Sequence, residues 1–448
     1  MVDIKPTISL IWIGHVDHGK STTLGHLLYQ IGAIDPRVME KLKEEAIQHQ
    51  MESWKWAYIL DSLPEEKQRG ITSDIAFYPF ETEERNFMLI DAPGHRDFVK
   101  NMIRGAAQAD ACILVVSAVP NDLKSGMKIG GYQDPGGQTR EHAILASVLG
   151  IQQLIVAINK LDSVDYREDR YNQAVNLIKK LLKEIQSPWA KKMDLIPFIP
   201  ISGLMGDNLT HPSENLKWYS GSTLIEALNS LEGLVHEEKK ELRFVTYDLD
   251  ERHGFGTLLV GKVISSALKN GDKIKILPLG ITTDIKEIWI QDVKVSTLKA
   301  GEHGSILLRN IDKDNIEEGV VLAPGRIDYS FASVVRSRLL ILEGSLVPGS
   351  SVVFHCGASY ATAHIFQITK ILRMNPKHKK LPREFEGKIT IAFEGELIEV
   401  DVALDATLVV EKFSDFPELG RVILRHSGTT IAVGIVNDLF VDSNYSDK

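Results

Sequence analysis

The eight residues Gly14–Ser21 constrain this chain more than any other feature of its sequence. They read Gly-His-Val-Asp-His-Gly-Lys-Ser and lie between an apolar run, Ile8–Ile13, and an amphipathic run, Lys20–Ile31. The pattern fits G-x-x-x-x-G-K-[ST], in which a strand, a glycine loop and a helix bring backbone N–H groups together around phosphate oxygens. In such a loop Lys20 can reach the outer phosphates, and the hydroxyl of Ser21 can bind Mg²⁺. The predicted phosphate-binding residues are Gly14, His15, Val16, Asp17, His18, Gly19, Lys20, Ser21 and Thr22.

The rest of the chain divides by its hydrophobic periodicity. From residue 8 to about residue 235, short apolar runs alternate with longer amphipathic ones, which predicts a mainly parallel sheet with helices on both faces. From residue 243 onwards, short alternating segments are separated by turn dipeptides such as Asn270-Gly271, as in antiparallel barrels or sandwiches. We expect a multi-domain protein with domains at 1–237, 238–328 and 329–448, and a helical insertion at 32–70 in the first.

Composition excludes several other classes of protein. Of 448 residues 44% are hydrophobic and 25% charged, so the chain can bury enough apolar surface to fold. The net charge of −9 excludes a general polycation that coats nucleic acid. Its two cysteines, Cys112 and Cys356, are too few for a disulfide framework. With no signal segment and no apolar run of about 20 residues, we expect a cytoplasmic protein without a membrane partner.

Two further loops carry a candidate metal ligand and candidate residues for binding the base of a nucleotide. Asp91 ends an apolar strand and begins the pattern D-x-x-G, so its carboxylate can hold Mg²⁺ through water, and Gly94 lets the backbone approach a γ-phosphate. Asn159 and Asp162, in Asn-Lys-Leu-Asp after another strand, offer an amide and a carboxylate that match the edges of guanine. An adenine edge would leave the carboxylate unpaired. The predicted base-binding residues are Asn159, Lys160, Asp162, Ser202, Gly203 and Leu204.

Five segments of the chain together resemble a translational GTPase, and specifically elongation factor 1-alpha of archaea and eukaryotes. They are Gly14–Ser21, Arg69–Thr72, Asp91–His95, Gln138–His142 and Asn159–Asp162. The similarity covers most of residues 5–230 and returns near the end of the chain, from Leu419 to Val436. It implies a P-loop α/β GTPase domain followed by two antiparallel β-barrels.

The resemblance also implies a reaction and its participants. The protein would bind GTP or GDP with Mg²⁺ and hydrolyse GTP, with catalytic roles for Lys20, Thr72, Gly94 and His95; His95 would orient the attacking water. Ser21, Thr72 and Asp91 would bind the metal. The implied partners are aminoacyl-tRNA, the ribosome and a guanine nucleotide exchange factor, and we expect a monomer.

Other functions share this architecture and stay open at this point. The cargo of such a GTPase can be a release factor or a Pelota-like protein, in termination or ribosome rescue, instead of aminoacyl-tRNA. A divergent paralogue that only binds is another alternative, although the presence of Lys20, Ser21, Thr72, Asp91 and His95 argues against lost hydrolysis. GTPases that act with ATP sulfurylase are a more remote alternative.

A run of cations in the third predicted domain could contact the phosphates of an RNA stem. A basic stretch on an acidic protein is a reasonable phosphate-binding surface, and a solvated loop is the alternative. The cations are Lys370, Arg373, Lys377, Lys379, Lys380 and Arg383.

Overall fold

The computed structural model describes most of the chain as two compact units. Among the described residues, the first unit runs from residue 7 to 233 and the second from residue 240 to 441. The predicted boundary between residues 237 and 238 falls outside the described residues. The predicted division between 328 and 329 lies within them, and both stay predictions. The described residues are 7–34, 37, 56, 76–91, 99–128, 137–185, 187–233, 240–252, 256–290, 293–309, 311, 316, 319–379 and 381–441.

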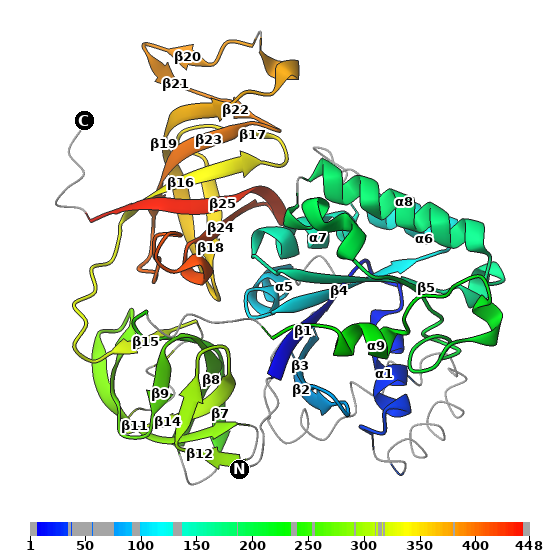
Figure 1. Ribbon diagram of the computed structural model, residues 1–448. Coiled ribbons are helices and arrows are strands. Elements are labelled where there is room, and N and C mark those ends of the chain that lie inside the picture. The colour runs from blue at the N-terminus through cyan, green and yellow to red at the C-terminus, as the bar shows by residue number, and fades with distance from the viewer. Residues whose placement is uncertain are drawn as a thin grey trace, which may run out of the picture. The chain divides into compact units, whose positions relative to one another are not determined.

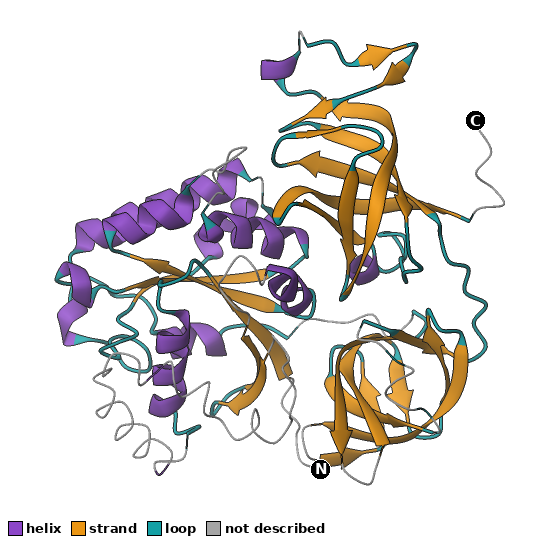
Figure 2. Cartoon of the chain, turned by 180° about the vertical axis from the view of Figure 1, so that it is seen from behind, coloured by secondary structure: helices purple, strands orange, loops and turns teal. Residues whose placement is uncertain are grey.

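The first unit is a sheet covered by helices on both faces (Figures 1 and 2). Its strands are β1 (Thr7–Ile13), β2 (Ala76–Glu81), β3 (Asn86–Asp91), β4 (Ala111–Ser117), β5 (Gln153–Asn159) and β6 (Phe198–Pro200). They lie in the order β2-β3-β1-β4-β5-β6, and β2 alone of the six runs antiparallel to its neighbour. Every residue of β4 is buried, as expected for a parallel strand covered on both faces. The predicted mainly parallel sheet is confirmed.

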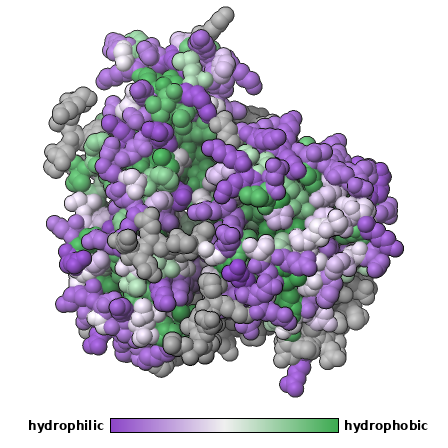
Figure 3. Space-filling model, in the orientation of Figure 1, coloured by the Kyte–Doolittle hydropathy of each residue, from purple (hydrophilic) through white to green (hydrophobic). Residues whose placement is uncertain are grey.

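Amphipathic helices supply the two outer layers of this unit. They are α1 (Lys20–Gln30), α5 (Val99–Ala106), α6 (Pro120–Met127), α7 (Gln138–Val148), α8 (Glu168–Glu184) and α9 (Leu224–Asn229), with short 3₁₀ helices η3 (Asp162–Val164), η4 (Pro188–Leu195) and η5 (Glu214–Leu216). In α8 the buried residues Ala174, Ile178 and Leu181 recur at helical spacing. Hydrophilic residues cover much of its outer face (Figure 3). A capping box formed by Thr223 and Glu226 begins α9.

The second unit begins with a closed antiparallel barrel. Its strands are β7 (Arg243–Arg252), β8 (Gly256–Ser265), β9 (Ala267–Lys269), β10 (Lys273–Leu277), β11 (Ile281–Ile290), β12 (Val293–Val295), β13 (Thr297–Lys299), β14 (His303–Leu308) and β15 (Val321–Pro324). The order β10-β15-β7-β8-β14-β11 closes through the pairing of β10 with β11, which makes a ring of six strands. Closure removes exposed strand edges and encloses an apolar core around Phe244 and Ile288.

A second barrel of six strands follows in the same unit. Its elements are β16 (Val334–Ile341), β17 (Ser345–Leu346), β18 (Ser351–Cys356), β19 (Ser359–Arg373), η7 (Pro376–His378), β20 (Glu384–Phe385), β21 (Lys388–Ile389), β22 (Ala392–Phe393), β23 (Leu397–Leu404), η8 (Pro417–Leu419), β24 (Arg421–His426) and β25 (Thr429–Phe440). The ring β18-β24-β25-β16-β23-β19 closes between β18 and β19. The short strands β20 and β21 form an arm beyond it (Figure 1). The predicted fold class, an α/β domain followed by two antiparallel barrels, is confirmed.

Candidate nucleotide-binding site

Four loops that the sequence separates widely meet at one edge of the sheet in the first unit. Strands β1, β4, β5 and β6 are parallel, so the segments that follow them all leave from their carboxyl ends. These segments are the phosphate loop after β1, the start of α6 after β4, the loop that follows Asn159 at the end of β5, and the loop that begins at Ser202 after β6. Ligands of open α/β sheets bind at this edge.

The backbone of the phosphate loop needs glycine at two positions. Gly14 has φ 142° and Gly19 has φ 85°, in the region that favours glycine. A Cβ on Gly14 would lie 2.3 Å from the carbonyl oxygen of Val115 in β4, and a Cβ on Gly19 would lie 2.4 Å from Nδ2 of Asn159. The loop therefore packs too closely against two strands to carry a side chain at either position.

Lys20 folds back over the phosphate loop. Its ammonium donates to the carbonyl oxygens of Gly14 at 3.0 Å and His15 at 2.9 Å, and the residue is 8% exposed. A buried ammonium held at the start of α1 carries a positive charge to the place where the helix N-terminus also favours anions. The location suits an outer phosphate group, as the sequence predicts for this lysine.

Helix α7 holds the phosphate loop from behind through two side chains. The N–H of Val16 donates to Oε1 of Gln138 at 3.0 Å, and the N–H of Gly14 donates to Nδ1 of His142 at 3.1 Å. Burial, together with the charges of Lys20 and His15, lowers the pKa of His142 to about 3. The ring is therefore neutral at pH 7 and can accept this hydrogen bond.

The loop after β5 joins the phosphate loop to the loop after β6. Nδ2 of Asn159 donates to the carbonyl oxygen of His18 at 2.9 Å and to Oγ1 of Thr23 at 3.1 Å. On its other side, Oδ1 of Asn159 accepts the N–H of Gly203 at 2.8 Å. Asn159 is 2% exposed, so its amide acts as a buried clamp between the three loops.

Asp162 and Ser202, two of the predicted base-binding residues, are hydrogen-bonded to each other. The hydroxyl of Ser202 donates to Oδ1 of Asp162 at 2.5 Å and accepts the N–H of Met205 at 3.0 Å. Because the single proton of the Gly203 N–H is used by Asn159, a backbone donor to a base would have to come from Leu204 instead. Leu204 is 39% exposed at the rim of this loop.

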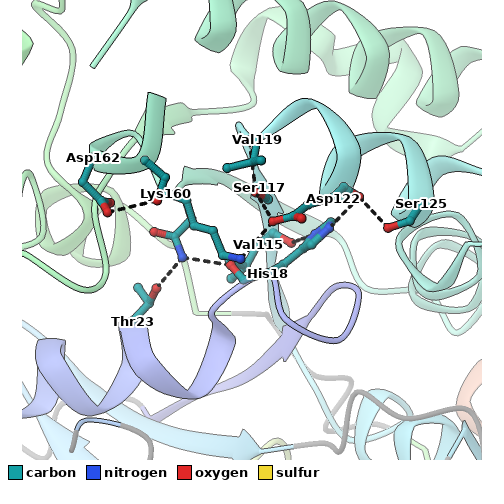
Figure 4. A network of polar contacts seen from close by, with 11 residues as sticks. His18, Thr23, Val115, Ser117, Val119, Asp122, Ser125, Lys160 and Asp162 are labelled. Atoms are coloured by element: carbon teal, nitrogen blue, oxygen red, sulfur yellow. Dashed lines mark hydrogen bonds and ion pairs between the residues drawn. The ribbon is translucent and has the colours of Figure 1, made fainter. Parts of the chain in front are cut away.

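Helix α6 contacts both the phosphate loop and the base loop through one residue, Asp122 (Figure 4). Its carboxylate accepts from Nζ of Lys160 and from Oγ of Ser117, both at 2.9 Å. Its carbonyl oxygen lies 3.1 Å from Nε2 of His18, whose Nδ1 lies 3.3 Å from the carbonyl oxygen of Val115. Burial lowers the pKa of His18 to about 4, so its ring is neutral at pH 7.

The structure describes some of the remaining predicted site residues and not others. Ser21 and Thr22 lie half-buried in the first turn of α1, and Asp17 is exposed with φ 63°. Asp91 is the last residue of β3 and pairs with Trp12 of β1, the strand that leads into the phosphate loop. The predicted catalytic residues Thr72, Gly94 and His95 lie outside the described residues.

Sequence reasoning missed three residues of this site: Asp122, Gln138 and His142. The last two fall in the segment Gln-Thr-Arg-Glu-His, which supports the family resemblance but does not by itself show what the side chains do. Asp122 had no signal in the sequence, because an acidic residue in the first turn of a helix is ordinary.

These loops and this sheet define a class, the P-loop proteins that bind guanine nucleotides. The family model of the elongation factor Tu GTP-binding domain matches residues 5–247, and the model described as GTP-eEF1A C-terminal domain-like matches residues 335–437. Proteins named elongation factor 1-alpha are similar along nearly the whole chain. The one from Ignicoccus hospitalis is 39% identical over 441 residues, which are 97% of this chain and 96% of that protein. The one from Staphylothermus marinus is 40% identical over 441 residues, 97% of each chain.

This protein belongs to the elongation factor Tu and 1-alpha family of translational GTPases, enzymes that bind guanine nucleotides and hydrolyse GTP. A solved structure, the GTPase-like domain of S. cerevisiae Ski7 bound to GTP, is similar with a TM-score of 0.72 at 18% identity. It covers 97% of this chain and 99% of that one, and it supports the fold alone. No helix in the described part of the chain is long and apolar enough to span a membrane.

Proposed function

We propose that this protein carries aminoacyl-tRNA to the ribosomal A site in its GTP-bound form and hydrolyses GTP there. The observation that supports it best is the joining of the phosphate loop to the base loop by Asn159, in a chain similar over 97% of its length to proteins named elongation factor 1-alpha. Exchange of GDP for GTP would change the contacts of the loops that touch the γ-phosphate, and the barrels would bind or release the tRNA accordingly.

Mg²⁺ is part of this proposal. The first turn of α1 carries the hydroxyl of Ser21, and Asp91 ends β3, which pairs directly with the strand that leads into the phosphate loop. A hydroxyl and a carboxylate are oxygen ligands of the kind that Mg²⁺ prefers, and Thr72 would supply another hydroxyl. When bound, the metal would neutralise charge on the phosphates, and Lys20, Gly94 and His95 would bind the γ-phosphate and orient water.

The third predicted domain would contribute the surface for the RNA. Lys370, Arg373, Lys377 and Lys379 are exposed, so they can reach phosphates. Arg383 is not part of this surface, because it is 9% exposed and pairs with the fully buried Glu396 at 2.8 Å. Lys380 lies outside the described residues. The proposed phosphate contacts are therefore fewer than the sequence suggests.

Protection of the aminoacyl ester tests the cargo. Charged tRNA is incubated with the protein preloaded with a non-hydrolysable GTP analogue or with GDP, and the remaining ester is measured over time. We expect the GTP form to slow hydrolysis of the ester strongly and the GDP form to leave it nearly unchanged. No protection by either form, together with nucleotide-dependent binding of a release-factor-like or Pelota-like protein, would favour the termination or rescue function instead.

A further inference from the structure

Asp122 connects two loops that the nucleotide must bind at once, and it belongs to neither. It lies in the first turn of α6, after β4, whereas the phosphate loop follows β1 and Lys160 follows β5. The contact of its carbonyl oxygen with His18 spans 104 positions of the chain, and the contact of its carboxylate with Lys160 spans 38. Figure 4 shows these side chains converging on the carboxyl edge of the sheet.

The carboxylate of Asp122 is built to stay charged and in place. Burial alone would raise its pKa, but the hydrogen bonds from Lys160 and Ser117 outweigh burial and hold the pKa below its usual range. Ser117 is itself fixed, because it is fully buried and its hydroxyl accepts the N–H of Val119. The acceptor that faces Lys160 is therefore ionised and oriented before any ligand binds.

Lys160 is the residue that this carboxylate holds. Its backbone has φ 62°, an unusual conformation for a residue with a side chain, and its side chain is 30% exposed at the rim of the site. A free lysine side chain would have to give up about 2 kcal/mol of rotamer entropy to adopt one position over a nucleotide. A charge-assisted hydrogen bond that fixes it beforehand reduces that loss on binding.

We propose that Asp122 is a positioning residue of the guanine-nucleotide site, holding Lys160 in place through its carboxylate and packing against His18 of the phosphate loop through its carbonyl. This inference rests on the proposed nucleotide site and adds to it a residue that belongs to neither of the two loops it joins. Loss of the carboxylate would loosen Lys160 and shorten the residence of GDP, while the carbonyl contact with His18 and the fold would persist.

The test uses the full chain and a fluorescent GDP, without tRNA or ribosomes. Asp122→Asn should speed GDP dissociation about tenfold, which corresponds to about 1.4 kcal/mol. Asp122→Glu, which keeps a carboxylate, should recover most of the difference. The matched control is Asp169→Asn in the same unit. Asp169 lies 2.7 Å from Arg167 in an exposed ion pair, so this variant loses the same charge but should release GDP at the wild-type rate.

A double substitution separates positioning from stability. Lys160→Met alone should weaken GDP binding, and if Asp122 acts through Lys160, adding Asp122→Asn to Lys160→Met should change it no further. Full additivity of the two substitutions, or a loss of binding by Asp122→Asn that follows a lowered unfolding midpoint, would overturn the positioning role. GDP dissociation unchanged in Asp122→Asn would overturn this inference alone, whereas a wild-type chain that fails to bind GDP would overturn the proposed function with it.

Discussion

The two units of this protein use polar residues in opposite ways. In the first unit, the buried polar groups around the phosphate loop are mostly neutral: an amide at Asn159, another at Gln138, and imidazoles at His18 and His142 that hold backbone groups. In the second unit, charges are paired in and around the barrels, as in Arg243 with Glu411 and Arg383 with Glu396. Neutral side chains can hold the loops of a site that must accept a polyanion without adding negative charge to it, whereas a barrel uses charge pairs to hold itself together.

The barrels should therefore suffer most from losing one charge. Arg243 is 3% exposed, donates to Oε1 of Glu411 at 2.9 and 3.0 Å, and its guanidinium lies 4.5 Å from the ring centre of Phe416. Arg243→Met would leave the half-buried carboxylate of Glu411 without its partner, which should lower the free energy of unfolding of the second unit by about 3 kcal/mol. Urea unfolding followed by circular dichroism measures this loss.

An exposed pair in the same unit provides the control. Lys294 lies 2.8 Å from Glu287, but its side chain is 57% exposed, so Lys294→Met should cost less than about 1 kcal/mol. The double variant Arg243→Met with Glu411→Gln should recover part of the loss. Equal effects of Arg243→Met and Lys294→Met would contradict the contrast between the two units.

In the first unit, the neutral histidines should produce acid sensitivity. The pKa of His142 is lowered by burial to about 3 in the folded state, and a histidine in the unfolded chain titrates near its ordinary value of 6.5. The unfolded state therefore binds more protons below pH 6.5, so stability that is fully present above that pH falls as the pH decreases towards 3. The slope from this group alone approaches about 1.4 kcal/mol per pH unit.

His142→Gln tests that slope, because glutamine can accept the N–H of Gly14 but does not titrate. Urea midpoints measured between pH 7 and pH 4.5 should fall less steeply in the variant than in the wild type. His18 contributes in both proteins, since its pKa is lowered by burial to about 4. Parallel curves would mean that the ring of His142 is not neutral and buried in solution.

The smallest expected effect concerns the exposed cations of the third predicted domain. If Lys377 and Lys379 contact RNA phosphates, their replacement by Glu should weaken binding of aminoacyl-tRNA by about 1 to 2 kcal/mol at low salt, and by less as salt increases. Binding by filter retention over a series of salt concentrations measures it. The control replaces Lys191 and Lys192, two exposed lysines of the first unit, by Glu. It changes the charge by the same amount and should not weaken binding of the tRNA.

The sequence predicts those parts of the fold and of the site whose residues are neighbours in the chain. A strand, a glycine loop, a lysine and a helix are neighbours in sequence, so their spacing alone predicts the phosphate loop that β1 and α1 now flank. Asn159 and Asp162 are predicted as base-binding residues in the same way, because they directly follow an apolar run. Turn dipeptides predicted β structure after residue 243, but whether the strands close into barrels depends on pairings such as β10 with β11 and β18 with β19.

What only the tertiary structure decided is which distant side chains complete those loops. Gln138 and His142 reach the phosphate loop from positions 122 and 128 residues away, and nothing in their local sequence sets that distance. The sequence predicts Arg383 as one more surface cation, but in the structure it is buried and paired with Glu396. By itself the sequence determined the class of ligand, because backbone loops and base-reading residues are local; the parallel sheet decided what supports them, because it brings the ends of its strands to one edge.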